Sequence, residues 1–277
     1  MFRRKIELKT PKQQKIMAEA GLILADALDR TVAAVEDGIS TAELDAIFSA
    51  AITEAGTTSN FLGYHGFPGT ICTSINEEAV HGIPSKDVIV RNGDVLKIDG
   101  GCILNGWHAD SARTVLVGEK PDPEDVRLSE VTKNAMWAGI AALANATHIG
   151  QVGIAIEEAI EAAPGKKLGI LRDYAGHGIG SEMHMEPDVL NYAAHYPRPI
   201  KIKPGMCFCI EPITSLGSEE TLLLEDEWTV VTADGSNTCQ WEHAVAVHKD
   251  GIWVLTAPDG GEAGLAPFGI KPTPISI

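Results

Sequence analysis

Two aspartates flank an Asn-Gly pair within a stretch of alternating apolar residues. Asn105-Gly106 is a strong hairpin signal, because both central positions of a type I′ turn need a positive φ. With that turn as the centre of two antiparallel strands, Asp99 lies opposite Ala112. Since side chains alternate between the faces of a strand, Asp99 and Asp110 share one face, as diagonal neighbours about 7 to 8 Å apart. The sequence therefore predicts two converging carboxylates on a mostly apolar ribbon.

This carboxylate pair needs cations or a shared proton, because two such charges repel each other and lose hydration. Arg113 is an odd number of residues from Asp110, so its side chain is expected on the opposite face of the strand. A metal centre is the simplest answer. Two structural alternatives stay open: both aspartates face solvent, or Asp99 pairs with Lys97 on its own strand.

Three later residues could complete such a centre. His177 lies in AGHGIG, where glycines on both sides allow a close approach of the backbone. Glu211 ends the apolar run MCFCIE, and Glu242 lies in the aromatic and β-branched run QWEHAV. A glutamate buried in such a strand needs a partner. The alternative for His177 is a capping or core histidine.

Together, Asp99, Asp110, His177, Glu211 and Glu242 offer four carboxylates and one imidazole. This oxygen-rich set suits two divalent first-row ions bridged by carboxylates better than it suits a thiolate zinc site. A water bridging the two ions would be a nucleophile near neutral pH, so hydrolysis is the expected reaction. The sequence leaves Co, Mn, Fe and Zn open as the metal.

Two other histidines lie in sequences typical of loops, His81 in AVHGIP and His184 in SEMHMEP. Neither belongs to an apolar helical face, so we expect both in the wall of a pocket. Histidines that do not bind metal can still hydrogen-bond a substrate carbonyl or amide, or transfer protons.

The surrounding elements repeat in order. Residues 11 to about 36 and 42–54 read as helices, with an N1 proline after Thr10 and a Ser40/Glu43 capping box. Strands and the aspartate hairpin follow. Residues 124 to about 145 and 152–163 again read as helices, and residues 201–212 and 228–247 as strands. The order predicts one internally duplicated α+β domain over residues 1–256, with two helix-helix-strand halves, rather than two separate domains. Residues 257–277, rich in Pro and Gly, form a packed or disordered tail.

Composition excludes several classes of protein. A net charge of -16 argues against a general nucleic-acid or anionic-membrane surface. Five cysteines without a CxxC pair argue against a disulfide framework. The N-terminal stretch MFRRKIELKT is followed by no apolar run of a signal peptide. We therefore expect a cytoplasmic protein, and a monomer because no apolar stripe calls for a partner.

These motifs resemble those of the type I methionine aminopeptidases, metallopeptidases with the pita-bread fold, in which two pseudo-symmetric α+β halves surround a central antiparallel sheet. NEEAVHGIP, KIDGG, GHGIG, EMHMEP, FCIEP and WEHAV occur in the family order, and the resemblance extends over residues 11 to 255. The 31-residue spacing from Glu211 to Glu242 matches type I, and the chain looks like the short bacterial form. The resemblance implies metal-dependent removal of the N-terminal methionine from nascent polypeptides, near the ribosome.

The resemblance also assigns roles. It implies that Asp99 chelates one metal, that Asp110 and Glu242 bridge both, and that His177 and Glu211 complete the other site. It makes His81 and His184 the catalytic and substrate-orienting histidines, and Glu211 the general base. The implied pocket for the methionine side chain consists of Tyr64, Phe67, Cys72, Met183 and Trp228, with Phe61 beside them. An apolar, partly aromatic lining suits a thioether.

Two other readings compete with this one. An aminopeptidase P or prolidase shares the fold but usually carries a further N-terminal domain. A non-catalytic pita-bread module would bind peptides or partner proteins, and such modules lack the metal ligands, whereas all five residues stand here.

Overall fold

The computed structural model describes residues 6–194 and 199–276. Residues 1–5 and 195–198 of the expected domain and Ile277 of the expected tail lie outside the described residues. Four long helices occur in two pairs, α1 (Pro11–Ala33) with α2 (Thr41–Glu54), and α3 (Pro123–Leu143) with α4 (Gly150–Glu161). A short helix, α5 (Glu262–Leu265), and two 3-10 turns, η1 (Tyr64–Gly66) and η2 (Ala266–Phe268), complete the helical elements of this part of the chain.

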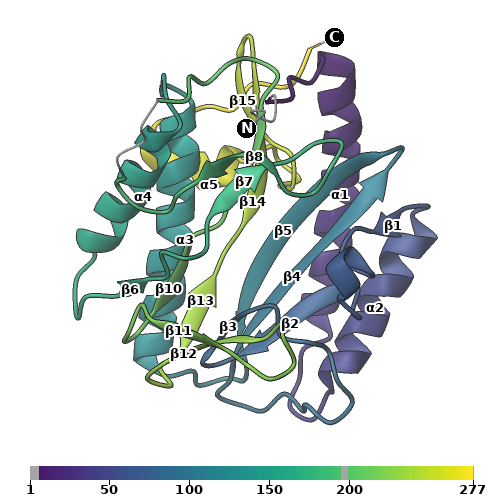
Figure 1. Ribbon diagram of the computed structural model, residues 1–277, viewed down its shortest axis with the longest axis vertical. Coiled ribbons are helices and arrows are strands. Elements are labelled where there is room, and N and C mark those ends of the chain that lie inside the picture. Colours follow the sequence, from purple (N-terminus) through teal and green to yellow (C-terminus); the bar gives the residue numbers. More distant parts are fainter. Residues whose placement is uncertain (1–5, 195–198, 277) are drawn as a thin grey trace.

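Short strands and one long hairpin lie between and after these helices. The strands are β1 (Thr58–Ser59), β2 (Ile71–Ile75), β3 (Glu78–Val80), β4 (Val95–Leu104), β5 (Trp107–Leu116), β6 (Gly169–Ile170), β7 (Gly176–Gly178), β8 (Met185–Val189), β9 (Cys207–Ile210), β10 (Ile213–Ser215), β11 (Thr221–Leu223), β12 (Val230–Thr232), β13 (Thr238–Gln240), β14 (His243–His248) and β15 (Gly251–Val254). All their pairings are antiparallel. The predicted α+β order of two helix-helix-strand halves is confirmed (Figure 1).

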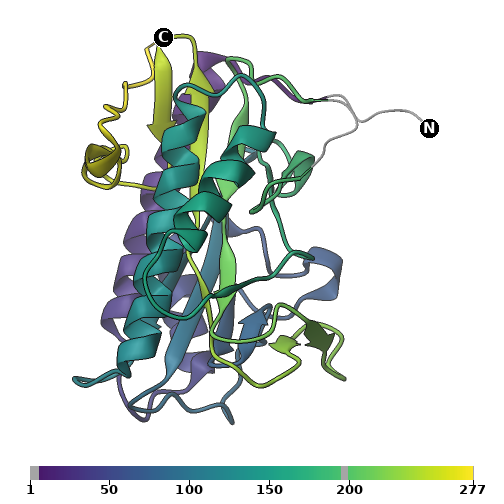
Figure 2. The ribbon, with the colours of Figure 1, turned by 90° about the vertical axis from the view of Figure 1, so that its left-hand side faces the viewer.

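The strands form two larger sheets that meet at the centre of the molecule. In the first half, β4 pairs with β1, β2 and β5; in the second, the order is β15-β14-β9-β7-β8. The Glu242 amide, just before β14, donates to the Ala112 carbonyl on β5 over 3.2 Å. The His108 amide on β5 donates to the Gly180 carbonyl over 3.0 Å. These bonds join the two halves, while α1 and α3 lie on one face of the strands (Figure 2).

Each half has its own apolar core. Leu24 and Phe48, from α1 and α2, pack with Ile98 of β4 in the first half. Met136 of α3 packs with Phe208 of β9 in the second half. The central strands therefore pack against apolar side chains on the face covered by the helices. The polar groups of the site lie on their other face.

Local signals explain most element boundaries. Thr10 caps α1 in a capping box with Gln13, and Ser40 caps α2 in the same way with Glu43. Helix α1 ends at Ala33, earlier than the predicted residue 36. The Ala34 amide donates to the carbonyl of Thr31, only three residues back, and this bond closes the helix.

The predicted hairpin has the predicted register, with Asp99 opposite Ala112 and Asp110 opposite Gly101. Asn105 and its neighbour Gly106 have φ values of 51° and 81°, as a type I′ turn requires.

Two long strand predictions in the second half are wrong in extent. Within residues 201–212 only β9 forms a regular strand of more than one residue, because a turn closed by the Met206 amide and the Lys203 carbonyl precedes it. Residues 228–247 divide into β12, β13 and β14, with a turn at Gly235. Residues 257–276 pack down, since Leu265 is fully buried and Ile275 nearly so. Across the described residues, no helix combines the length and apolar character needed to cross a membrane.

Candidate active site

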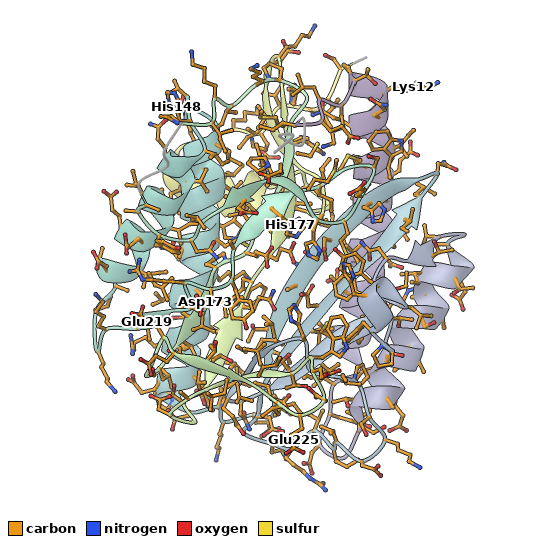
Figure 3. All side chains as sticks on the ribbon, viewed as in Figure 1. Lys12, His148, Asp173, His177, Glu219 and Glu225 are labelled. Carbon is orange, nitrogen blue, oxygen red and sulfur yellow. The ribbon has the colours of Figure 1, made fainter. Side chains whose placement is uncertain are left out.

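A cavity of about 390 Å³ opens where the two sheets meet. Both halves contribute to its wall, and Figure 3 shows His177 near the middle of the molecule between the strands of the two halves. The wall includes all five residues predicted to bind metal, among them the predicted catalytic Glu211, and the eight other residues predicted for substrate binding or catalysis. They are Phe61, Tyr64, Phe67, Cys72, His81, Asp99, Asp110, His177, Met183, His184, Glu211, Trp228 and Glu242.

The five metal-type residues come from five strands or strand ends. Asp99 lies on β4 and Asp110 on β5, while His177 lies on β7. Glu211 directly follows β9, and Glu242 lies just before β14. His177 Nε2 is 3.3 Å from Glu211 Oε1, and ligand atoms of Asp110, His177 and Glu242 lie within 4.8 Å of one another. The fold thus gathers residues that are up to 143 positions apart in the chain.

Asp110 and Glu242 are buried, Asp99 and Glu211 are partly buried, and the cluster is short of hydrogen-bond partners. Among the described residues, Asp99 Oδ1, Asp110 Oδ1 and Glu242 Oε1 have no hydrogen-bond partner. Burial raises the pKa of Asp99 to about 7. Burial, and then the neighbouring carboxylates, raise the pKa values of Asp110, Glu211 and Glu242 well above the ordinary range. Such a cluster requires either protons or cations, and its oxygen-rich donor set fits divalent metal ions.

The alternative partners for Asp99 are engaged elsewhere. The Lys97 ammonium donates to the carbonyls of Asn76 and Val95 over 2.8 Å and 3.2 Å. The Arg113 guanidinium bonds backbone carbonyls, including that of Glu242, rather than the carboxylates. Asp99 is partly buried and faces the cavity, where its Oδ1 atom is enclosed, so it does not lie on the outer surface.

His177 is prepared to act as a ligand through Nε2. Its Nδ1 lies 3.0 Å from the Gly178 carbonyl, which can only accept, so Nδ1 carries the proton. Burial, with the nearby His184 ring, lowers the pKa of His177 to about 3. The imidazole is therefore neutral, and its Nε2 lone pair points toward the carboxylates.

His81 and His184 border the same cavity without joining the carboxylate cluster. The rings of His184 and His177 are 4.3 Å apart between centroids, and His184 Nδ1 lies 2.8 Å from the Tyr64 hydroxyl. Burial lowers the pKa of His81 to about 4, so this side chain is neutral near pH 7. His81 also has a φ of 61°, an unusual value for a residue with a side chain.

An apolar pocket adjoins the carboxylates. Phe61, Phe67, Cys72 and Met183 form a buried cluster, and Tyr64, Ile83 and Trp228 pack against it. The rings of Phe67 and Trp228 meet edge to face at 5.0 Å. All six residues predicted for the side-chain pocket therefore lie together, and Ile83 is an addition that the sequence reading missed.

Gln240 is a second residue that the sequence reading missed. Its Nε2 donates to Asp99 Oδ2 over 3.3 Å, and it also hydrogen-bonds the Glu211 carboxylate. The sequence could have indicated it. Gln240 lies two positions before Glu242 in CQWE, and residues two apart on an extended chain point to the same face.

Comparisons with known proteins agree with this geometry. Residues 15–249 match metallopeptidase family M24. Methionine aminopeptidase 1 of Mycobacterium tuberculosis is 43% identical over 257 residues, which cover 92% of this chain and 96% of that protein. The chain belongs to family M24, among its type I methionine aminopeptidases.

Solved structures place this aminopeptidase in the pita-bread fold. The crystal structure of methionine aminopeptidase from Rickettsia prowazekii has a TM-score of 0.86 and 37% identity, covering 91% of this chain and 100% of that one. Prolidase from Pyrococcus furiosus has a TM-score of 0.70 at 21% identity and shares the fold; 90% of this chain and 65% of that one are covered. Membership in the family makes the chain a metallo-aminopeptidase, and its Asp, His and Glu cluster is the candidate metal-binding region.

Proposed function

We propose that this cavity is the site at which the chain removes the N-terminal methionine from nascent polypeptides. One observation carries the proposal: buried carboxylates without partners open directly onto a pocket lined by aromatic rings and sulfur. A catalytic centre and a pocket for a thioether side chain thus share one cavity.

Asp99, Asp110, His177, Glu211 and Glu242 would hold two divalent ions, with Co, Mn, Fe and Zn as the candidates. Four negative charges balance two dications, which explains the shortage of protein partners around the carboxylates. Bound there, the ions would supply Lewis acidity, which polarises a carbonyl group and lowers the pKa of water.

Glu211 is the proposed general base. Its partly buried carboxylate lies against His177 and Gln240, and its pKa lies well above the ordinary value because of desolvation and the Asp99 and Asp110 charges. A carboxylate with a raised pKa accepts a proton from water readily and can return it to the leaving amine. One side chain can therefore serve both proton transfers of peptide hydrolysis.

His81 and His184 are the proposed groups that orient the substrate. Both border the cavity, and burial lowers the pKa of each. A neutral imidazole carries one N–H that can donate to the carbonyl of the scissile peptide and stabilise its developing charge. Tyr64 fixes the ring of His184 through the 2.8 Å contact with Nδ1.

The pocket selects the first residue. Phe61, Phe67, Cys72, Met183 and Trp228 would surround the methionine side chain with apolar surface. We further propose that the substrates are nascent chains near the ribosome, and that the protein works as a cytoplasmic monomer.

The test is release of free methionine from a Met-Ala-Ser peptide by chelator-stripped protein, before and after adding Mn, Fe or Co. We expect no release without metal, and release after addition. Glu211→Gln should lower kcat by about 10²- to 10⁴-fold, the usual contribution of a general base. Metal content of the variant must be measured in parallel, because Glu211 is also a proposed ligand.

Two control substrates separate the rival functions. A proline-specific enzyme would cleave Met-Pro-Ser and leave Met-Ala-Ser intact, whereas we expect release of methionine from Met-Ala-Ser. A non-catalytic binding module would cleave neither peptide with any metal. Folded, metal-loaded protein that releases no methionine from Met-Ala-Ser would overturn the proposed function.

A further inference from the structure

A thiol lies within the metal-type cluster. Cys209 is on β9, two residues before Glu211, so the two side chains share a face of the strand. Its Sγ and ligand atoms of Asp110, His177 and Glu242 all lie within 4.8 Å of one another. Cys209 is completely buried, and its thiol also hydrogen-bonds the Glu242 carboxylate. The sulfur therefore lies where the polar cluster meets the apolar core that includes Met17 and Ile179.

The groups around this thiol are short of partners. Asp110 and Glu242 are 3% and 1% exposed, and one carboxylate oxygen of each has no hydrogen-bond partner in the described structure. The lone pair of His177 is on Nε2, which lies 3.3 Å from Glu211 Oε1, because Nδ1 bonds the Gly178 carbonyl. One sulfur, one nitrogen and two carboxylates thus point to a shared centre.

We propose that Cys209 is a metal ligand, and that Asp110, His177, Cys209 and Glu242 form a four-coordinate site for a thiophilic divalent ion such as Zn²⁺. Zinc accepts sulfur, nitrogen and carboxylate oxygen in four-coordinate sites. Binding converts the thiol to a thiolate and releases its proton to solvent.

This site differs from the five-residue oxygen-rich site in its choice of metal. Hard ions such as Mn²⁺ prefer carboxylate ligands and bind sulfur weakly, while softer ions bind a thiolate more tightly. The inference rests on the proposed function only in locating the metal in this cavity.

The other cysteines serve as internal controls. Cys207 Sγ lies 3.7 Å from Gln14 Nε2, and Cys239 donates to Thr114 Oγ1 over 3.2 Å. Cys102 Sγ bonds the Ala20 carbonyl, and Cys72 belongs to the side-chain pocket. Among the described thiols, only Cys209 falls in the four-residue cluster. Cys207→Ser is the closest matched control, because Cys207 lies on the same strand and is equally enclosed.

X-ray absorption at the zinc edge tests the inference on the unmodified protein. Chelator-stripped wild type is loaded with one equivalent of Zn²⁺, and we expect one sulfur neighbour at about 2.3 Å from the metal. A shell of nitrogen and oxygen alone would overturn the inference. This measurement needs no variant, so a folding defect cannot obscure it.

Cobalt absorption gives a second readout with variants. Wild type and Cys207→Ser, each loaded with one equivalent of Co²⁺, should show a thiolate-to-cobalt charge-transfer band in the near ultraviolet. Cys209→Ser should lose that band, and its persistence would assign the sulfur to another residue. Methionine release by Mn²⁺-loaded wild type is measured separately. Release without a zinc–sulfur shell overturns only the role of Cys209, and a sulfur shell without release overturns only the proposed function.

Discussion

Gln240 Nε2 donates a hydrogen bond to Asp99 Oδ2 over 3.3 Å, which joins β13 of the second half to β4 of the first. The same side chain bonds the Glu211 carboxylate. Residues that hydrogen-bond metal ligands fix the direction of their oxygens, so Gln240 positions two proposed ligands at once.

Gln240→Ala should therefore weaken metal binding by about 10- to 100-fold, the usual effect of losing such a partner. Isothermal titration with Mn²⁺ measures the change in Kd. Gln151→Ala is the control, because Gln151 accepts hydrogen bonds from the Thr147 and His148 amides and takes no part in the cavity wall. An unchanged Kd in Gln240→Ala would show that Asp99 and Glu211 hold their orientation without this amide.

The stabilisation of the folded protein by bound metal should depend on pH. Without metal, the raised pKa of Asp99, about 7, means that the native state holds a proton that the unfolded state loses near pH 4. Between these values the native state binds more protons, so this group's contribution to stability falls as pH rises. Bound metal removes this loss of stability at higher pH, because metal binding requires the ionised carboxylates.

We accordingly expect the increase in Tm on adding Mn²⁺ to grow between pH 5 and pH 8, as measured by calorimetry with and without metal. Asp99→Asn should make the increase smaller and less dependent on pH. A metal-induced shift of equal size at both pH values would contradict the assignment of these carboxylates as metal ligands.

The side-chain pocket should lose selectivity when its aromatic wall is removed. Trp228 packs edge to face on Phe67, so Trp228→Ala opens the side of the pocket. We expect kcat/KM for Met-Ala-Ser to fall by about 10- to 200-fold, as for imperfect filling of an apolar pocket. Activity on Phe-Ala-Ser should fall less or rise.

Leu223→Ala serves as the control for this variant, because Leu223 is 62% exposed on the neighbouring strand β11. Equal losses for both peptides with Trp228→Ala would indicate a general folding defect instead of a change in selectivity.

A short segment before α1 braces the loop that carries Met183 and His184. Glu7 accepts hydrogen bonds from the Ser181 hydroxyl and amide over 2.5 Å and 3.2 Å. The Lys9 ammonium lies 3.3 Å from the same carboxylate. Hydrogen bonds to a charged group typically contribute about 1.5 to 3 kcal/mol.

Glu7→Ala should therefore speed amide hydrogen exchange in residues 179–184 and raise KM for Met-Ala-Ser severalfold, with Glu36→Ala as an exposed acidic control. Mass spectrometry of the exchanged protein locates the change. Exchange in residues 179–184 at the wild-type rate would mean that the loop is held by its own strands, β7 and β8.

Much of the site could be predicted because its signals are local. The Asn105-Gly106 turn fixes the hairpin register, and the register alone puts Asp99 and Asp110 on one face. The capping boxes at Thr10 and Ser40 fix two helix starts in the same local way. Where a strand depended on distant partners, prediction failed in extent, as for residues 201–212.

The sequence by itself determined the residue types of the centre, the hairpin that pairs two of its carboxylates, and the family. Tertiary structure alone decided that Gln240 bonds Asp99, that Lys97 turns to the Asn76 carbonyl, and that Cys209 joins the cluster. The reason is physical: turns and caps depend on neighbours within a few residues, whereas the partner of a buried polar group depends on how two separately folded halves pack.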